Sequence, residues 1–113
     1  MLYTADREHH LEREIIPALE KGYTVITDRY FYSTLAYGSL NMSIEWLKHI
    51  CEGFLEPDLA YYLKVQPRTA VQRIHSGRFE TELFEKEKIL TGIATTYDQL
   101  TTDYPILQSI DGE

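Results

Sequence analysis

The sequence places an acid, a base and an aromatic residue side by side in Asp28-Arg29-Tyr30, directly after an apolar, β-branched segment at residues 23–27. We predict that this segment is a buried strand. In open α/β sheets the ligand lies beside the carboxyl ends of the strands, which is where the tripeptide would stand. An arginine there can bind a phosphate in a bidentate manner, and an aspartate can hold water around a metal ion. The alternative interpretation is a helix N-cap aspartate followed by a surface arginine.

A second group of basic residues surrounds a predicted break between two helices. Arg73 and Arg78 lie on either side of His75-Ser76-Gly77. Guanidinium groups that are clustered on a turn can bind an anion through charge-assisted hydrogen bonds. The alternative is a solvated basic turn whose arginines pair with the acids of the following helix.

The composition is that of one globular domain without a membrane span. Of the 113 residues, 43% are hydrophobic and 26% are charged, and the formal net charge is −7. This negative charge argues against a general nucleic-acid binder, because such proteins neutralise phosphates with Lys and Arg. The N-terminus has no secretory pattern, and the single cysteine, Cys51, is expected to be a buried free thiol. We therefore expect a cytoplasmic protein with no nucleic-acid and no membrane partner.

Helical and strand-like segments alternate along the chain, which predicts an α/β domain with a parallel sheet. Gly22 would end the first helix, and Pro17 inside that helix would remove one backbone hydrogen bond. The strands would run parallel with helices between them. Helices are expected at residues 4–21, 32–39, 43–52, 67–75 and 82–102, and strands at residues 23–27, 59–65 and 106–110.

Several windows of the sequence follow one another in an order that is typical of a single enzyme family. In DRYFYSTLAYG, the tripeptide after a strand leads to a serine and an Ala-Tyr pair. Upstream, YTADREHHLEREIIPALEKG has an aromatic residue and an arginine four positions apart in a helix that ends in Pro-Ala-Leu and a glycine. Downstream come PDLAYYLKV, RIHSGRFE and SIDG. Together these windows closely resemble thymidylate kinases, with their Pro-Asp strand, lid and terminal strand, over essentially all 113 residues.

The resemblance implies an incomplete P-loop nucleoside monophosphate kinase fold, with residues 1–113 forming a partial thymidylate kinase domain. Members of the family carry GxxxxGK[ST] after their first strand, where backbone N–H groups and a lysine cradle the donor phosphates. No such motif occurs in the sequence. We therefore expect three parallel strands with flanking helices, while the central P-loop strand and the last C-terminal helix of the family are absent.

The resemblance also implies an acceptor site for dTMP. Tyr3 matches the aromatic residue that stacks on thymine, and Arg7 matches the arginine that hydrogen-bonds the base. They are four residues apart, so a helix puts them on one face. Arg29 matches the residue that binds the dTMP phosphate, while Ser33 and Tyr37 match residues that line the deoxyribose and base pocket. The alternatives are a cation–π pair on a helix surface for the first two and simple packing for the last two.

On the donor side, the resemblance implies ATP and Mg²⁺. Asp28 matches the acid beside the magnesium ion and its waters, and it acts with Arg29 in catalysis. Arg73 and Arg78 match arginines of a lid that closes over ATP, so both are candidates for catalysis and for ATP binding. Asp111 lies in the strand end that would stand beneath the adenine.

The function that the resemblance implies is transfer of a phosphoryl group from ATP to dTMP, giving dTDP for dTTP biosynthesis. The 113-residue chain is expected to be inactive by itself, and the complete enzyme is expected to form a homodimer. One alternative is a kinase for another nucleotide or a deoxynucleoside. Another is a relative without a P-loop that only binds a nucleotide or a protein partner.

Overall fold

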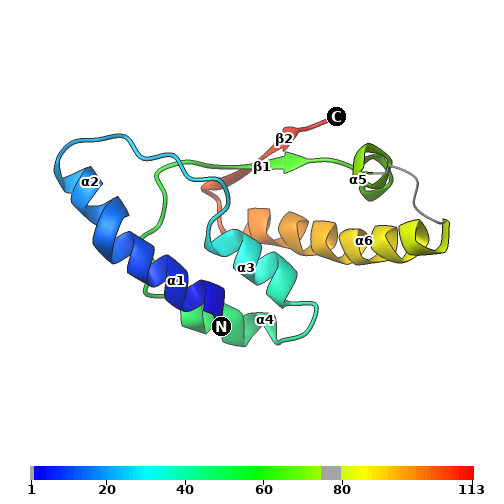
Figure 1. Ribbon diagram of the computed structural model, residues 1–113, viewed down its shortest axis with the longest axis horizontal. Helices are drawn as coiled ribbons and strands as arrows, with labels where there is room; N and C mark the ends of the chain where they lie inside the picture. Colours follow the sequence, from blue (N-terminus) through cyan, green and yellow to red (C-terminus); the bar gives the residue numbers. More distant parts are fainter. Residues whose placement is uncertain (1, 75–79) are drawn as a thin grey trace. The chain divides into compact units, whose positions relative to one another are not determined.

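The computed structural model describes the backbone of residues 2–74 and 80–113 and the side chains of residues 5–74 and 84–113 (Figure 1). The chain divides into two compact units, Met1–Glu56 and Pro57–Glu113. The first unit is helical, and the second combines helices with a small sheet. In the part of the chain that the structure describes, no helix is both long enough and apolar enough to span a bilayer.

The first unit begins with a nearly continuous run of helix that confirms the helix predicted at residues 4–21. Its turns are successively α1 (Leu2–His10), a π-helical turn η1 (Leu11–Ile15) and α2 (Ile16–Glu20). Pro17 stands in the first turn of α2, where its missing N–H is tolerated. The π-helical turn precedes it, and the N–H of Ile16 donates to the carbonyl of Leu11, five residues back. Gly22 then ends the helix with φ 86°, as predicted.

The predicted strand at residues 23–27 is absent from the structure, and this part of the fold prediction was wrong. The segment has no regular secondary structure, and two of its apolar side chains are exposed, Tyr23 at 67% and Ile26 at 92%, while Val25 is half-buried. β-branched residues favour a strand only where a neighbouring strand supplies hydrogen bonds and another layer covers the side chains. No described residue pairs with this segment, so its sequence preference is not realised.

The core of the first unit lies around α3 (Phe31–Gly38) and α4 (Ile44–Cys51), which pack against each other. These helices confirm the predictions at residues 32–39 and 43–52. Leu35 and Ala36 are completely buried. Gly38 permits the close approach of the two helices, because a Cβ there would meet the Leu47 side chain at 2.9 Å. The other buried residues of this core are Leu11, Phe31, Tyr32, Leu47, Cys51 and Phe54.

The second unit is built on a parallel pair of strands, β1 (Ala60–Lys64) and β2 (Leu107–Asp111). In register, Ala60 pairs with Leu107 and Lys64 with Asp111, so the carboxyl ends of the two strands lie together. The strands confirm the predictions at residues 59–65 and 106–110 and their parallel direction. The sheet has two strands among the described residues, where the sequence had predicted three.

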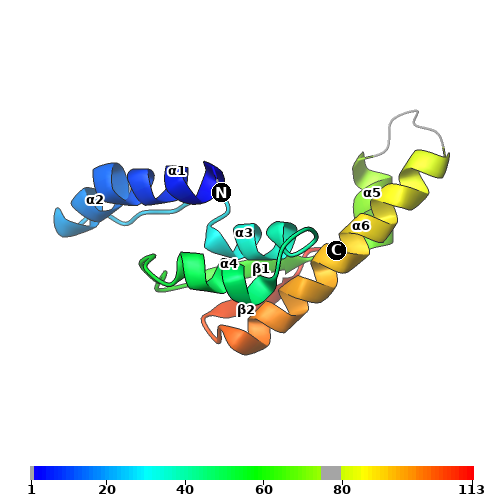
Figure 2. The ribbon, with the colours of Figure 1, turned by 90° about the horizontal axis from the view of Figure 1, so that it is seen from below.

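Helices α5 (Pro67–Ile74) and α6 (Glu80–Asp103) connect the two strands and confirm the last two predicted helices. α6 lies along the strand pair in both views (Figures 1 and 2). The rings of Tyr62 on β1 and Tyr97 on α6 stack with centroids 4.6 Å apart, and Leu100 of α6 is completely buried. The helix therefore covers one side of the sheet and positions its strand ends.

Candidate functional site

The backbone of Arg29 is strained, because its φ is 64° and places it in the left-handed region. Residues other than Gly, Asn and Asp are rarely found there, and for an L-residue the conformation costs about 1–2 kcal/mol. The hydroxyl of Thr27 donates to the carbonyl oxygen of Arg29 at 3.0 Å and supports this conformation. Strain of this kind concentrates at functional sites, and Arg29 is the residue predicted to bind the dTMP phosphate. That role stays a prediction.

The guanidinium carbon of Arg29 lies 5.1 Å from the ring centroid of Tyr37, within the range of a cation–π contact. Tyr37 lies near the end of α3, and its side chain is 39% exposed. Arg29 and the neighbouring Asp28 are both exposed. The arginine is thus supported by an aromatic ring while part of its guanidinium remains open to a ligand.

Arg7 of α1 lies against α3, where its Nε donates to the hydroxyl oxygen of Thr34 at 3.2 Å. Both residues are half-buried. The hydroxyl of Tyr30, the residue just before α3, donates to the carbonyl of Leu55 at 2.7 Å. Burial raises the pKa of Tyr30, and the positive charge of Arg7 partly offsets this rise. Arg7, in the second turn of α1, therefore lies against α3 and close enough to Tyr30 to affect its pKa.

Two side chains of α3 each contact one of the arginines predicted for the acceptor site. Thr34 contacts Arg7 and Tyr37 contacts Arg29. Thr34 and Tyr37 are three residues apart, which puts them on the same side of the helix. Ser33 lies in the same helix but is buried, with 7% of its surface exposed. The structure thus joins Arg7, Arg29 and Tyr37 through one helix and encloses Ser33.

The side chains of two predicted site residues lie outside the described part of the structure. Tyr3 lies on α1, four residues before Arg7, but its side chain lies outside the described residues. Arg78 lies outside them altogether. Their predicted roles stay predictions.

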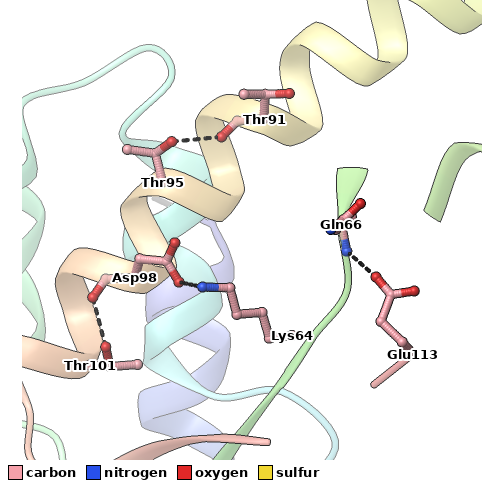
Figure 3. A network of polar contacts seen from close by, with 7 residues as sticks. All are labelled: Lys64, Gln66, Thr91, Thr95, Asp98, Thr101 and Glu113. Carbon is pink, nitrogen blue, oxygen red and sulfur yellow. Dashed lines mark hydrogen bonds and ion pairs between the residues drawn. The ribbon is translucent and has the colours of Figure 1, made fainter. Parts of the chain in front are cut away.

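Arg73 of α5 is bound to the carboxyl end of the sheet in the second unit. Its two Nη groups donate to the carbonyl oxygens of Gly112 and Glu113, each at 3.0 Å. The N–H of Gly112 in turn donates to the carbonyl of Lys64 at 2.8 Å. Glu113 also accepts from the N–H of Gln66 through its Oε1, at 2.9 Å (Figure 3). In this arrangement Arg73 holds the strand end together, so its predicted contact with ATP stays a prediction.

The strand ends line an open cavity of about 300 Å³. Asp111, predicted to lie beneath adenine, is the last residue of β2 and lines this cavity. Its Oδ1 accepts from the N–H of Glu113 at 2.9 Å. Lys64, at the end of β1, forms an ion pair with Asp98 of α6 at 2.9 Å (Figure 3). The other residues that line the cavity are Gln66, Ser109 and Glu113.

No preformed metal centre is present in the described part of the chain, where no group of three or more His, Cys, Asp or Glu side chains could hold an ion. Asp28 offers one exposed carboxylate. Mg²⁺ is commonly held by one or two carboxylates together with substrate phosphates and water, so a single exposed aspartate is compatible with this ion.

Two residues that support the arginines were not found from the sequence. Thr27 holds the carbonyl of Arg29, and Thr34 holds the Nε of Arg7. A threonine two residues before a strained position is a known local signal, because its hydroxyl can bond the backbone nearby. Thr34 had no comparable signal, since its partner lies 27 residues away on another helix.

Known proteins are similar to this chain in sequence over most of its length. Residues 1–111 match the family model described as Thymidylate kinase. The probable thymidylate kinase of Staphylothermus marinus is 40% identical over 98 residues, which are 86% of this chain and 49% of the relative. That of Thermococcus kodakarensis is 31% identical over 112 residues, 98% of this chain and 55% of the relative. The thymidylate kinase of Brachyspira hyodysenteriae is 32% identical over 105 residues, 91% of this chain and 52% of the relative.

These matches place the chain among the nucleoside monophosphate kinases, a class whose members have an α/β P-loop kinase fold. Within that class, the chain belongs to the thymidylate kinase family. The chain spans about half the length of the curated relatives that it matches.

Proposed function

We propose that the protein containing this chain transfers a phosphoryl group from ATP to dTMP and so produces dTDP. The observation that carries the proposal is the strained backbone of Arg29, whose guanidinium lies against Tyr37. A guanidinium held in advance loses less conformational entropy when it binds an anion, and its planar fork matches the oxygens of a phosphate. Family membership makes the 5′-phosphate of dTMP the natural anion.

The acceptor site in this proposal lies along α3. Arg29 binds the phosphate of dTMP and Arg7 hydrogen-bonds the thymine, on which Tyr3 stacks. Tyr37 supports Arg29 and, with Ser33, borders the sugar. Support comes from the contacts that link both arginines to the same helix.

The donor side in this proposal depends on ATP and Mg²⁺. Asp28 would hold the ion through water, and the ion would neutralise charge on the donor phosphates. Arg73 and Arg78 would lie near the phosphates and Asp111 near the adenine. Phosphoryl transfer needs little covalent chemistry from the protein, so positioning and charge stabilisation by these side chains would carry the catalysis.

We further propose that residues 1–113 bind dTMP but do not catalyse the transfer by themselves, because no GxxxxGK[ST] motif occurs in them. The complete enzyme would be a cytoplasmic homodimer. To test the donor half, the DNA upstream of the first codon would be read for an in-frame GxxxxGK[ST]. Radiolabel transfer from ATP to dTMP would then be measured with the encoded protein. An in-frame stop codon directly upstream, or no transfer, would favour a protein that only binds nucleotides.

Calorimetric titration of residues 1–113 tests the acceptor half. Wild type is expected to bind dTMP about tenfold or more tightly than thymidine, because a charge-assisted hydrogen bond contributes roughly 1.5–3 kcal/mol. Arg29→Ala should abolish this preference, and Arg29→Lys should retain part of it. Equal affinities for dTMP and thymidine in the wild type would refute the proposed phosphate site. Tighter binding of dCMP or a purine nucleotide would identify a kinase of different specificity.

A further inference from the structure

The contact between Arg7 and Thr34 joins two helices that are distant in the sequence. Arg7 lies on α1 and Thr34 on α3, and the Nε of the arginine is 3.2 Å from the threonine Oγ1. Both side chains are half-buried, so the bond is partly protected from water. A hydrogen bond from a charged donor in such a place is stronger than one on an open surface.

The choice of the Nε atom determines what the rest of the guanidinium can do. Arg has five N–H donors in a rigid planar fork, and one of them is on Nε. When Nε–H is bound to Thr34, the motion of the group is restricted and the four N–H donors of the two Nη groups remain. One of them runs parallel to Nε–H, and the other three face away from that edge of the guanidinium. Among the residues that the structure describes, Arg7 makes no other hydrogen bond or ion pair, so these donors are available to a ligand.

Arg7 lies close enough to two partly buried groups, Tyr30 and Cys51, to affect their pKa values. Its charge lowers the pKa of Tyr30 and of Cys51, opposing in both cases a larger rise caused by burial. A free arginine side chain has about 2 kcal/mol of rotamer entropy to lose on binding. The bond to Thr34 restricts the side chain before any ligand arrives.

We propose that Thr34 is a positioning residue, which orients the Arg7 guanidinium so that its Nη groups can donate to a carbonyl oxygen of the acceptor nucleobase. The inference rests on the proposed function for the identity of that ligand. It assigns to Thr34 a share of the selectivity for a base with a keto oxygen over one with an amino group at the same place. Thr34 would have no direct effect on the phosphate.

The test uses Thr34→Val, which removes the hydroxyl and keeps the shape, with Thr34→Ser as the control that restores the hydroxyl. We expect Thr34→Val to weaken dTMP binding about fivefold to tenfold and Thr34→Ser to bind nearly as well as wild type. Affinity for 2-deoxyribose 5-phosphate, which has no base, should be the same in all three proteins. Equal losses for both ligands would show a merely structural role and overturn the inference.

A double-mutant cycle with Arg7→Ala provides the second arm. If Thr34 acts through Arg7, Thr34→Val should cause no further loss of dTMP affinity in the Arg7→Ala background. Additive losses would contradict the inference. Both arms use residues 1–113, with circular dichroism to verify that each variant is folded as the wild type is.

A readout that needs no ligand separates this inference from the proposed function. The Nε–H signal of Arg7 in proton–nitrogen NMR should be protected from solvent exchange in wild type and Thr34→Ser, and should exchange rapidly in Thr34→Val. Unchanged exchange in Thr34→Val would refute the positioning bond even if dTMP binds. Protection in wild type without any dTMP binding would retain the bond and reject the proposed function.

Discussion

The Arg29 guanidinium lies over the Tyr37 ring, with 5.1 Å between the guanidinium carbon and the ring centroid, while the Arg29 backbone is held at φ 64°. The two residues stand at opposite ends of α3, Arg29 just before the helix and Tyr37 in its last turn. The helix thus determines the distance between the strained arginine and its aromatic support. We propose that this contact holds the Arg29 guanidinium in a position to bind a phosphate.

Changing the ring of Tyr37 tests whether it supports Arg29. Tyr37→Phe keeps the aromatic face, so the preference for dTMP over thymidine should stay within about twofold of wild type. Tyr37→Leu removes the cation–π contact, which contributes roughly 0.5–1 kcal/mol at an exposed site, and should reduce the preference about twofold to fivefold. Titration calorimetry of both ligands provides the measurement. An unchanged preference in Tyr37→Leu would mean that the ring does not orient the arginine.

The strain at Arg29 predicts an unusual order of stabilities. Glycine adopts positive φ without steric cost, whereas alanine retains the cost of about 1–2 kcal/mol. Arg29→Gly should therefore have a free energy of unfolding about 1 kcal/mol higher than Arg29→Ala, although glycine normally destabilises. Urea denaturation of the two variants measures the difference. A less stable glycine variant would show that position 29 does not adopt the left-handed conformation in solution.

Cys51 provides a prediction about pH. Its side chain is buried, and burial raises the pKa of the thiol, while the charge of Arg7 lowers it by a smaller amount. The midpoint of the alkylation rate against pH should lie above the usual thiol range of about 8–9. Arg7→Ala should move this midpoint higher still. A midpoint at or below the ordinary value would contradict the described environment.

The same shift has a consequence for stability. Because the pKa of Cys51 is raised in the folded state, its contribution to the unfolding free energy is complete below the unfolded pKa of about 8.5. The contribution is then lost as the pH rises through the folded pKa. Cys51→Ala should therefore show a weaker loss of stability between about pH 8 and pH 10 than wild type.

Gly112 tests the packing of the strand ends in the second unit. A Cβ there would lie 2.8 Å from a methyl carbon of Val65 and 3.2 Å from the carbonyl oxygen of Lys64. Gly112→Ala should lower the free energy of unfolding by about 1–3 kcal/mol, because the backbone cannot move aside without losing hydrogen bonds. Gly53→Ala is the matched control, since nothing lies within 4 Å of the added carbon. Equal stabilities of the two variants would contradict the close packing beside Arg73.

Local patterns in the sequence predicted the α-helices and both strands of the described residues. The helical periodicity of residues 82–102 and the apolar runs at 59–65 and 106–110 became α6, β1 and β2. The run at 23–27 had an equally good strand composition and formed none. The difference is physical, because β1 and β2 supply each other's hydrogen bonds and no described strand does so for residues 23–27.

The candidate site could be predicted by residue type but not by contact. Asp28 and Arg29 were predicted to follow a strand, but residues 23–27 form none and the two residues stand in a loop before α3. Nothing in the motif indicated positive φ at Arg29. The spacing of Arg73 suggested a lid, whereas its guanidinium binds carbonyl groups of Gly112 and Glu113 about 40 residues further along. Contacts between segments distant in the sequence depend on tertiary packing, which local patterns do not contain.

A crystal structure of residues 1–113 in complex with dTMP would test the central claim most directly. We expect an Arg29 nitrogen at about 2.7–2.9 Å from a phosphate oxygen and an Arg7 Nη atom within hydrogen-bonding distance of the base. Arg29 should keep its positive φ and its contact with Tyr37. A bound dTMP whose phosphate lies away from Arg29, with that side chain turned to solvent, would contradict the account.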